Sequence, residues 1–254
     1  MVPKVLVLRA AGSNCDQETK FAFDYVGGRA DLVHINRLLT GEIDLDAYHI
    51  LAIPGGFTYG DDISAGKILA NQLKYKLKED LIKFHRDGKL IIGICNGFQV
   101  LVRAGLLPDM NFEQRVTLSN NDSGKFEDRW VTLKINKTPC VFTQGLEKAL
   151  YLPVAHAEGK FIPQDEGIVD ELSASDQIVF QYSSPTGGEV KYPQNPNGSY
   201  LDIAGICDPS GRVLGMMPHP ERHIHPTNNP LWTRNGLSDN GDGTLLFRNA
   251  IEFF

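Results

Sequence analysis

The chain has 254 residues and a formal net charge of −6, with 42% hydrophobic and 22% charged residues. This acidic balance argues against a nucleic-acid-binding protein, because such proteins neutralise phosphates with clustered Lys and Arg. No apolar run has the length of a signal peptide core or of a membrane span, and the four cysteines are widely scattered. We therefore expect a reduced, cytoplasmic protein without a membrane segment.

The first part of the chain alternates short apolar runs with helical patterns. Runs of leucine and β-branched residues predict buried strands at residues 4–8, 31–35, 49–53 and 89–92. Leu77, Leu81 and Phe84 have helical spacing, and the following Asp-Gly pair ends that helix. This alternation predicts an α/β fold, an open and mostly parallel sheet with helices on both faces.

The second part of the chain is richer in strands. Strand patterns occur at residues 112–118, 130–135, 150–154, 178–182, 203–206 and 213–217. A segment rich in Pro and Gly at residues 183–199 predicts a long loop, and Phe247, Ile251 and Phe254 predict a terminal helix. No polar linker separates the two parts, so we expect a single domain over residues 1–254.

A cysteine stands between the fourth predicted strand and a helix. The sequence GICNG at residues 93–97 has the G-x-C-x-G spacing of a nucleophile elbow. Glycines fit there because a Cβ would crowd the strand or the helix in so tight a turn. The positive end of the helix would stabilise a thiolate, so Cys95 is the predicted nucleophile. We interpret Cys15, Cys140 and Cys207 as packing residues.

A histidine between two prolines is the candidate general base. The sequence MPHPER at residues 217–222 would deliver His219 at the carboxyl end of a strand. Prolines favour extended backbone, in which residues i and i+2 point the same way. Glu221 can therefore orient His219, which predicts a Cys95–His219–Glu221 triad.

The turn PGGF at residues 54–57 follows a strand that should neighbour the Cys95 strand. Two interpretations of this turn have equal weight: an ordinary type II turn, or half of an oxyanion hole in which the amide of Gly56 acts with that of Asn96. His219 and His223 are four residues apart, but the prolines disfavour helical spacing, so we expect no metal site. No complete phosphate-binding motif is present, so we expect no nucleotide site in this chain.

These motifs resemble those of the class I (triad) glutamine amidotransferases, and among them the glutaminase subunits of phosphoribosylformylglycinamidine synthases. The elbow and the H-P-E sequence carry the resemblance to the class. The segments PVAHAEG, NPNGS and MMPHPER, at residues 153–159, 195–199 and 216–222, carry the resemblance to these subunits. The resemblance spans nearly the whole chain and implies a flavodoxin-like architecture with extra antiparallel strands.

The resemblance also implies a reaction. Cys95 would attack the side-chain amide of L-glutamine, His219 would move protons, and Gln99 would contact the substrate. Ammonia would pass to a separate synthetase subunit, which uses ATP to amidate formylglycinamide ribonucleotide in a complex with a small third subunit. No cofactor is expected in this chain, because ATP and Mg would bind the synthetase.

Two other functions fit the same residues. A partner-independent elbow-cysteine hydrolase or peptidase would use the triad without preferring glutamine. A redox sensor would use Cys95 without needing His219. The segment at residues 223–243, rich in Asn, Gly and Pro, fits a partner-contact loop or a solvated insertion equally well.

Overall fold

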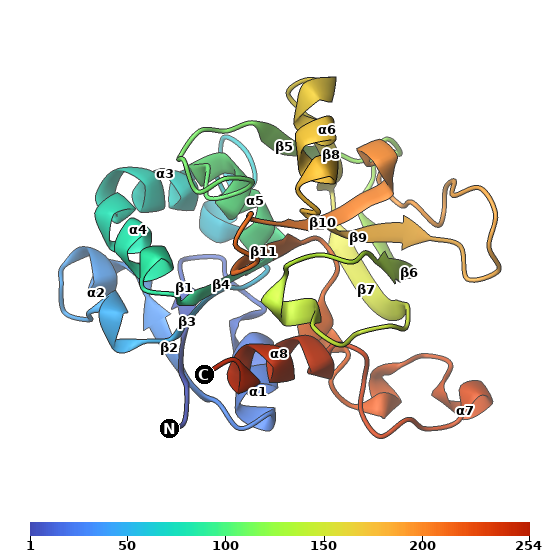
Figure 1. Cartoon of the computed structure of the whole chain (residues 1–254), viewed down its shortest axis with the longest axis horizontal. Helices are drawn as coiled ribbons and strands as arrows, with labels where there is room; N and C mark the ends of the chain where they lie inside the picture. Colours follow the sequence, from blue (N-terminus) through green and yellow to red (C-terminus); the bar gives the residue numbers. More distant parts are fainter.

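The computed structural model describes all 254 residues, which form one large sheet with helices packed on both faces (Figure 1). In spatial order its nine strands are β2 (Arg29–His34), β1 (Lys4–Arg9), β3 (Ile50–Ile53), β4 (Leu90–Ile94), β11 (Val213–Met216), β10 (Ile203–Cys207), β9 (Ile178–Ser183), β6 (Glu127–Ile135) and β7 (Leu150–His156). A second, two-stranded sheet pairs β5 (Val116–Asn120) with β8 (Glu158–Pro163).

Eight α-helices connect and cover these strands. They are α1 (Asp16–Tyr25), α2 (Ile35–Leu39), α3 (Lys67–Lys76), α4 (Lys78–Arg86), α5 (Asn96–Ala104), α6 (Glu166–Ala174), α7 (Trp232–Asn235) and α8 (Thr244–Glu252). Helices α1 and α8 contact each other on one face of the large sheet, and α3, α4 and α5 pack together on the other (Figure 1). None of the helices has both the length and the apolar character needed to cross a membrane.

The large sheet has a parallel half and an antiparallel half. Strands β2, β1, β3, β4 and β11 are parallel neighbours, whereas β10, β9, β6 and β7 pair in antiparallel fashion. Every residue of β3, β4 and β11 is buried, as expected for parallel strands covered on both faces. The mostly parallel α/β fold with extra antiparallel strands is thus confirmed, and one cluster of 65 buried hydrophobic residues runs through it.

The short helices α2 and α7 escaped the sequence patterns, and so did three longer elements, α3, β8 and α6. Helix α3 buries only Leu69, Ala70 and Leu73, a stripe too narrow and too short to show clear periodicity. Strand β8 contains a glycine and a proline, which weaken any strand pattern, and α6 has only three buried residues. The strand expected from residue 112 begins at Val116, because Phe112 has φ of 64° and cannot be extended.

The strand order brings distant segments to one edge of the sheet. Strand β11 pairs in parallel with β4, Met216 opposite Ile94, and β3 pairs with β4 on its other side, Ile53 opposite Gly93. The carboxyl ends of these three strands therefore meet at the same edge, where ligands bind in open α/β sheets. The chain segments that follow them carry the candidate site.

Candidate active site

Cys95 occupies a strained turn between β4 and α5. Its φ of 51° and ψ of −106° lie outside the regions that side chains ordinarily adopt, and it is the N-cap of α5. A Cβ on Gly93 would lie 2.6 Å from the carbonyl oxygen of Gly97, and one on Gly97 would overlap the carbonyl oxygen of Ile53. Both glycines are therefore required by close packing, as the elbow interpretation predicted.

Replacing Gly97 with alanine is expected to lower the free energy of unfolding by about 3 kcal/mol, because the new Cβ must displace the β3 backbone. Denaturant titration measures this change. Gly167→Ala is a matched control in helix α6, where the new Cβ would meet no backbone atom and only the capping oxygen of Asp165 lies near it, at 3.1 Å. Equal stabilities of the two variants would contradict the packing argument.

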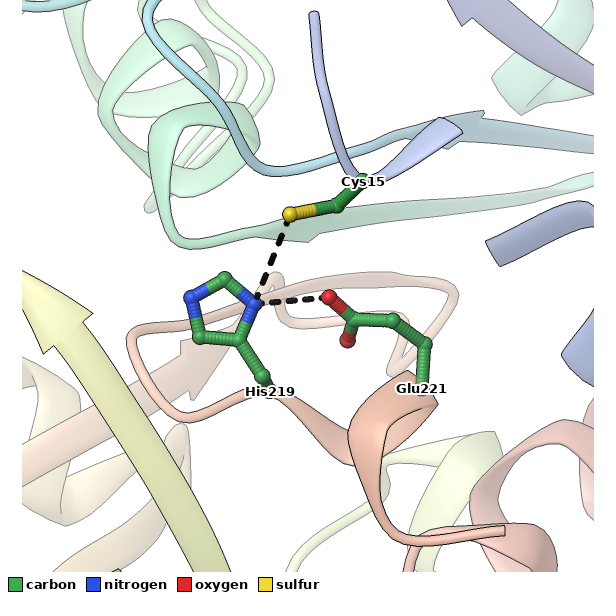
Figure 2. A group of neighbouring side chains, drawn as sticks. All are labelled: Cys15, His219 and Glu221. Atoms are coloured by element: carbon green, nitrogen blue, oxygen red, sulfur yellow. Dashed lines mark hydrogen bonds and ion pairs between the residues drawn. The ribbon is translucent and has the colours of Figure 1, made fainter. Parts of the chain in front are cut away.

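His219 and Glu221 form a buried pair just beyond β11. The Nδ1 atom of His219 lies 2.6 Å from Oε1 of Glu221, and both side chains are almost fully shielded from solvent (Figure 2). The backbone N–H of His219 donates to the carbonyl oxygen of Pro153 in β7, which fixes the segment. Because Nδ1 is engaged, Nε2 is the ring nitrogen that remains to exchange a proton, and it has no partner within the protein.

Cys95 and His219 line the same pocket at the sheet edge. Burial lowers the pKa of His219, but the negative charges of Glu221 and of an ionised Cys95 outweigh this effect and raise that pKa well above its usual value. The pocket therefore favours a protonated imidazole beside the sulfur of Cys95. Such a pair supplies a nucleophile together with a proton donor for a leaving group.

Of the two predicted oxyanion donors, Gly56 lines the same pocket and Asn96 directly follows Cys95 in the chain. Gly56 has φ of 144°, and its N–H donates to no acceptor within the protein. The N–H of Asn96 belongs to the first residue of α5, where helix geometry provides no acceptor. The side-chain oxygen of Asn96 accepts hydrogen bonds from the N–H and hydroxyl of Thr58, at 3.2 and 2.7 Å. These bonds tie the Gly56 turn to the elbow and favour an oxyanion hole over an isolated turn.

Gln99 lies one turn into α5 and lines a smaller pocket together with Cys95. Its amide nitrogen donates to the carbonyl oxygen of Glu158 at 2.6 Å, and its oxygen accepts from the side chain of Asn96 at 2.8 Å. Both ends of the amide are thus paired. Contact between Gln99 and a substrate requires that one of these bonds be exchanged.

Cys15 is closer to the site than its interpretation as a packing residue implied. It is buried, but its sulfur lines the Cys95 pocket and lies 4.0 Å from Nδ1 of His219 (Figure 2). Arg222 donates an N–H to the same sulfur at 3.2 Å. The position of Cys15 soon after the end of β1, at the same sheet edge, was the available signal for this placement.

His156, at the end of β7, is a second residue that the sequence patterns did not single out. Its Nδ1 lies 3.1 Å from the side-chain oxygen of Asn121, which also accepts from the N–H of Gly159. An oxygen only accepts, so Nδ1 carries the hydrogen and Nε2 presents a bare lone pair. That Nε2 has no partner, and His156 lines the smaller pocket beside Cys95.

The burial of His156 predicts a pH dependence of stability. Burial, reinforced by the nearby His219, lowers the pKa of His156 to about 3. Below pH 6.5 the unfolded chain binds a proton at this residue and the folded chain does not, so stability falls by about 1.4 kcal/mol per pH unit between pH 6 and 4. We expect His156→Gln to remove this slope, as measured by urea titrations at several pH values. An equally steep slope in His156→Gln would contradict the assignment.

The donor atoms of Cys15, His219 and Glu221 all lie within 4.8 Å of one another, which raises the question of a metal centre. The 2.6 Å separation of Nδ1 and Oε1 is too short to hold an ion with ligand bonds of about 2.0–2.2 Å. The guanidinium of Arg222 also opposes a cation at this sulfur. His223 is directed elsewhere, since its Nδ1 donates to the carbonyl oxygen of Tyr151 at 2.8 Å. The geometry thus favours hydrogen bonding between His219 and Glu221 over a metal centre.

Comparison with known proteins agrees with the fold. The CobB/CobQ-like glutamine amidotransferase domain matches residues 2–254. The chain therefore belongs to this family of glutamine amidotransferases.

Within the family, the chain is similar to proteins named phosphoribosylformylglycinamidine synthase subunit PurQ. The one from Dehalococcoides mccartyi is 47% identical over 98% of this chain and 97% of its own length. One from Methanococcus maripaludis is 44% identical over 100% of this chain and 98% of its own. In structure, a chain of PurLQS from Thermotoga maritima matches with a TM-score of 0.77 and 30% identity, over 100% of this chain and 99% of that one.

Proposed function

We propose that this chain is the glutaminase subunit of phosphoribosylformylglycinamidine synthase. It hydrolyses L-glutamine to glutamate and ammonia and supplies the ammonia to a separate synthetase subunit, in a cytoplasmic complex with a small third subunit. The synthetase uses ATP and Mg to convert formylglycinamide ribonucleotide to formylglycinamidine ribonucleotide. The single domain of residues 1–254 carries the glutaminase site. The observation that carries the proposal is the buried Glu221–His219 hydrogen bond of 2.6 Å, which leaves Nε2 for Cys95 at the sheet edge.

In the first half-reaction, the sulfur of Cys95 attacks the amide carbon of the glutamine side chain. The developing oxyanion accepts hydrogen bonds from the N–H groups of Gly56 and Asn96, each typically worth about 3 kcal/mol in the barrier. Protonated His219 gives its proton to the leaving nitrogen, so ammonia departs and a thioester remains on Cys95. The high pKa of His219 keeps this proton available at neutral pH.

In the second half-reaction, neutral His219 removes a proton from water, which attacks the thioester carbon. The thiolate of Cys95 leaves, glutamate is released, and His219 is again protonated. Glu221 holds the ring so that Nε2 serves both steps. Gln99 is proposed to contact the bound glutamine from α5, exchanging its bond to the carbonyl oxygen of Glu158.

A chloroketone analogue of glutamine tests the proposal in the assembled complex of this chain with its synthetase. We expect alkylation of Cys95, loss of glutamate release, and protection by excess glutamine, with peptide mass spectrometry locating the label. Cys15 lines the same pocket and is the internal control. Labelling of Cys15 in place of Cys95, or no glutamate release by the unlabelled complex, would refute the proposal. Hydrolysis that needs no partner and shows no preference for glutamine would favour the alternative hydrolase.

A further inference from the structure

The turn between β7 and β8 forms one wall of the active site. Residues 155–158 line the smaller pocket together with Cys95 and Gln99. The sulfur of Cys95 lies 3.7 Å from the carbonyl oxygen of Ala155. The side-chain amide of Gln99 donates to the carbonyl oxygen of Glu158 at 2.6 Å. The turn therefore contacts both the nucleophile and the residue proposed to contact glutamine, so its position sets the shape of the glutamine site.

A loop with buried polar side chains, residues 195–199, packs against this turn. The loop lies between β9 and β10 and contains no helix or strand, yet the side chains of Asn195, Asn197 and Ser199 are buried. Asn195 organises the loop, because its side-chain oxygen accepts from three backbone N–H groups within it, at 3.4, 2.9 and 3.2 Å. Buried polar groups need partners, and Asn197 finds one of its partners in the neighbouring turn segment.

The side chain of Asn197 is fully committed to hydrogen bonds. Its Nδ2 donates to the carbonyl oxygen of Gly159 at 2.9 Å and to the hydroxyl oxygen of Tyr182 at 3.1 Å. Its Oδ1 accepts from the N–H and the hydroxyl of Ser199, at 3.0 and 2.7 Å. A carbonyl oxygen only accepts and a backbone N–H only donates, so these partners fix the orientation of the amide. Because Asn197 is 0% exposed, bulk water does not compete for these bonds.

Gly159 directly follows the turn and is held at both of its backbone polar groups. Its N–H donates to the side-chain oxygen of Asn121 at 3.1 Å, and its carbonyl oxygen accepts from Asn197. Asn121 also donates to the carbonyl oxygen of His156 at 2.8 Å. A Cβ on Gly159 would lie only 2.3–2.6 Å from ring atoms of His156, so that ring packs directly on the glycine backbone. Two buried asparagines thus fix the turn, and neither of them lines a pocket of the active site.

We propose that Asn197 is a positioning residue of the glutaminase site: by holding the carbonyl of Gly159, it keeps the turn at residues 155–158 where glutamine binds. This inference deepens the proposed function and rests on it, because it takes glutamine as the substrate from there. A displaced turn changes the wall of the pocket and moves the carbonyl of Glu158 that anchors Gln99. The triad belongs to other segments, so the expected effect is on glutamine binding and not on the chemical steps.

Asn197→Asp tests the inference in the assembled complex. The substitution keeps the size of the side chain but places a carboxylate oxygen against the carbonyl oxygen of Gly159, and neither of them can donate. The hydroxyl of Tyr182 can turn to donate to the carboxylate, so the loss is confined to Gly159. We expect the KM for glutamine to rise at least about tenfold and kcat to stay within about threefold of the parent, as measured by glutamate release.

Asn249→Asp is the matched control. Asn249, on α8, donates its side-chain amide to the carbonyl oxygens of Phe142 and Gln144, at 3.0 and 2.8 Å, and lines neither pocket of the site. The same substitution therefore breaks the same kind of bond elsewhere. Both variants should lose thermal stability, and circular dichroism shows whether they are folded at the assay temperature. A parent KM in folded Asn197→Asp, or an equal rise of KM in Asn249→Asp, would overturn the inference.

Ser199→Ala is a milder second variant. It removes the hydroxyl that accepts from the N–H of Phe161 and donates to Oδ1 of Asn197, and leaves the amide of Asn197 in place. We expect the KM for glutamine to rise about threefold. Should Asn197→Asp fail to fold, this variant decides the question, and a KM equal to that of the parent would show that the loop does not position the turn.

The rate of Cys95 alkylation gives a readout that a purely structural role would not move. Iodoacetamide reacts with the thiol without occupying the glutamine site, whereas the chloroketone analogue of glutamine must bind first. We expect Asn197→Asp to slow the chloroketone at least about tenfold and iodoacetamide by less than about threefold. Equal slowing of both reagents would mean that the nucleophile itself is damaged, and the inference would be wrong. Absence of glutamate release by the parent complex would overturn the proposed function as well, whereas normal release with an unchanged KM in Asn197→Asp would overturn only this inference.

Discussion

Replacing Cys95 with alanine is expected to abolish the glutamine-dependent reaction of the complex, with a loss of at least about 10⁴-fold in kcat. The reason is chemical: no other group lies at the strained elbow where α5 begins, so no thioester can form. Formation of formylglycinamidine ribonucleotide from added ammonia should continue at the parent rate, because that step occurs on the synthetase. Both rates are measured on the same preparation, with glutamine or an ammonium salt as the nitrogen source.

Cys15→Ala is the matched control for this experiment, because it removes the other thiol of the same pocket. We expect it to retain glutamine-dependent activity within about tenfold of the parent, since its sulfur is not at the elbow. Loss of both the glutamine-dependent and the ammonia-dependent rate in Cys95→Ala would show that the two sites are not separate. A larger loss in Cys15→Ala than in Cys95→Ala would reassign the nucleophile.

The second large effect is expected at the base, where His219→Ala should lower kcat by about 10⁴-fold and Glu221→Gln by about 10²-fold. His219 transfers protons in both half-reactions, whereas Glu221 orients the ring and supports its charge. Removal of that charge lowers the pKa of His219, since Glu221 is a leading cause of its elevation. Steady-state kinetics and NMR titration of the His219 ring give the two readouts.

The contact between His219 and Glu221 also determines how the stability of the fold depends on pH. Protonated His219 stabilises the fold below the pKa of the unfolded chain, about 6.5, and this contribution is lost as pH rises through the higher pKa of the folded state. Glu221→Gln should therefore lose stability relative to the parent mainly at and below neutral pH. An unchanged His219 titration, or equal kinetic losses in His219→Ala and Glu221→Gln, would mean that Glu221 does more than orient the base.

The local parts of this site could be predicted from the sequence. The elbow depends on five consecutive residues between a strand and a helix, and the structure places Cys95 at the start of α5 as expected. The alternation of prolines around His219 likewise fixes its relation to Glu221, two residues away, and the structure gives the 2.6 Å contact. Short-range geometry of this kind is encoded by neighbouring residues.

The rest of the site depends on contacts between distant segments. Cys15 reaches His219 only because β1 and β11 end at the same edge of the sheet; its position after the first predicted strand indicated that edge but not the 4.0 Å approach to His219. His156 is a neutral acceptor for two reasons: Asn121 accepts a hydrogen bond from its Nδ1, and deep burial lowers its pKa. Both depend on the folded structure. The missed helix α3 shows the same limit, because its buried face is defined by packing against α5 more than by its own pattern.

The strand order has a consequence for the life of the newly made chain. The nucleophile is synthesised well before its base, because His219 follows β11, and β11 inserts beside β4 although more than a hundred residues separate the two strands in the chain. Fragments released early, whether by interrupted synthesis or by cleavage within the long loop at residues 184–199, lack the imidazole and cannot consume glutamine.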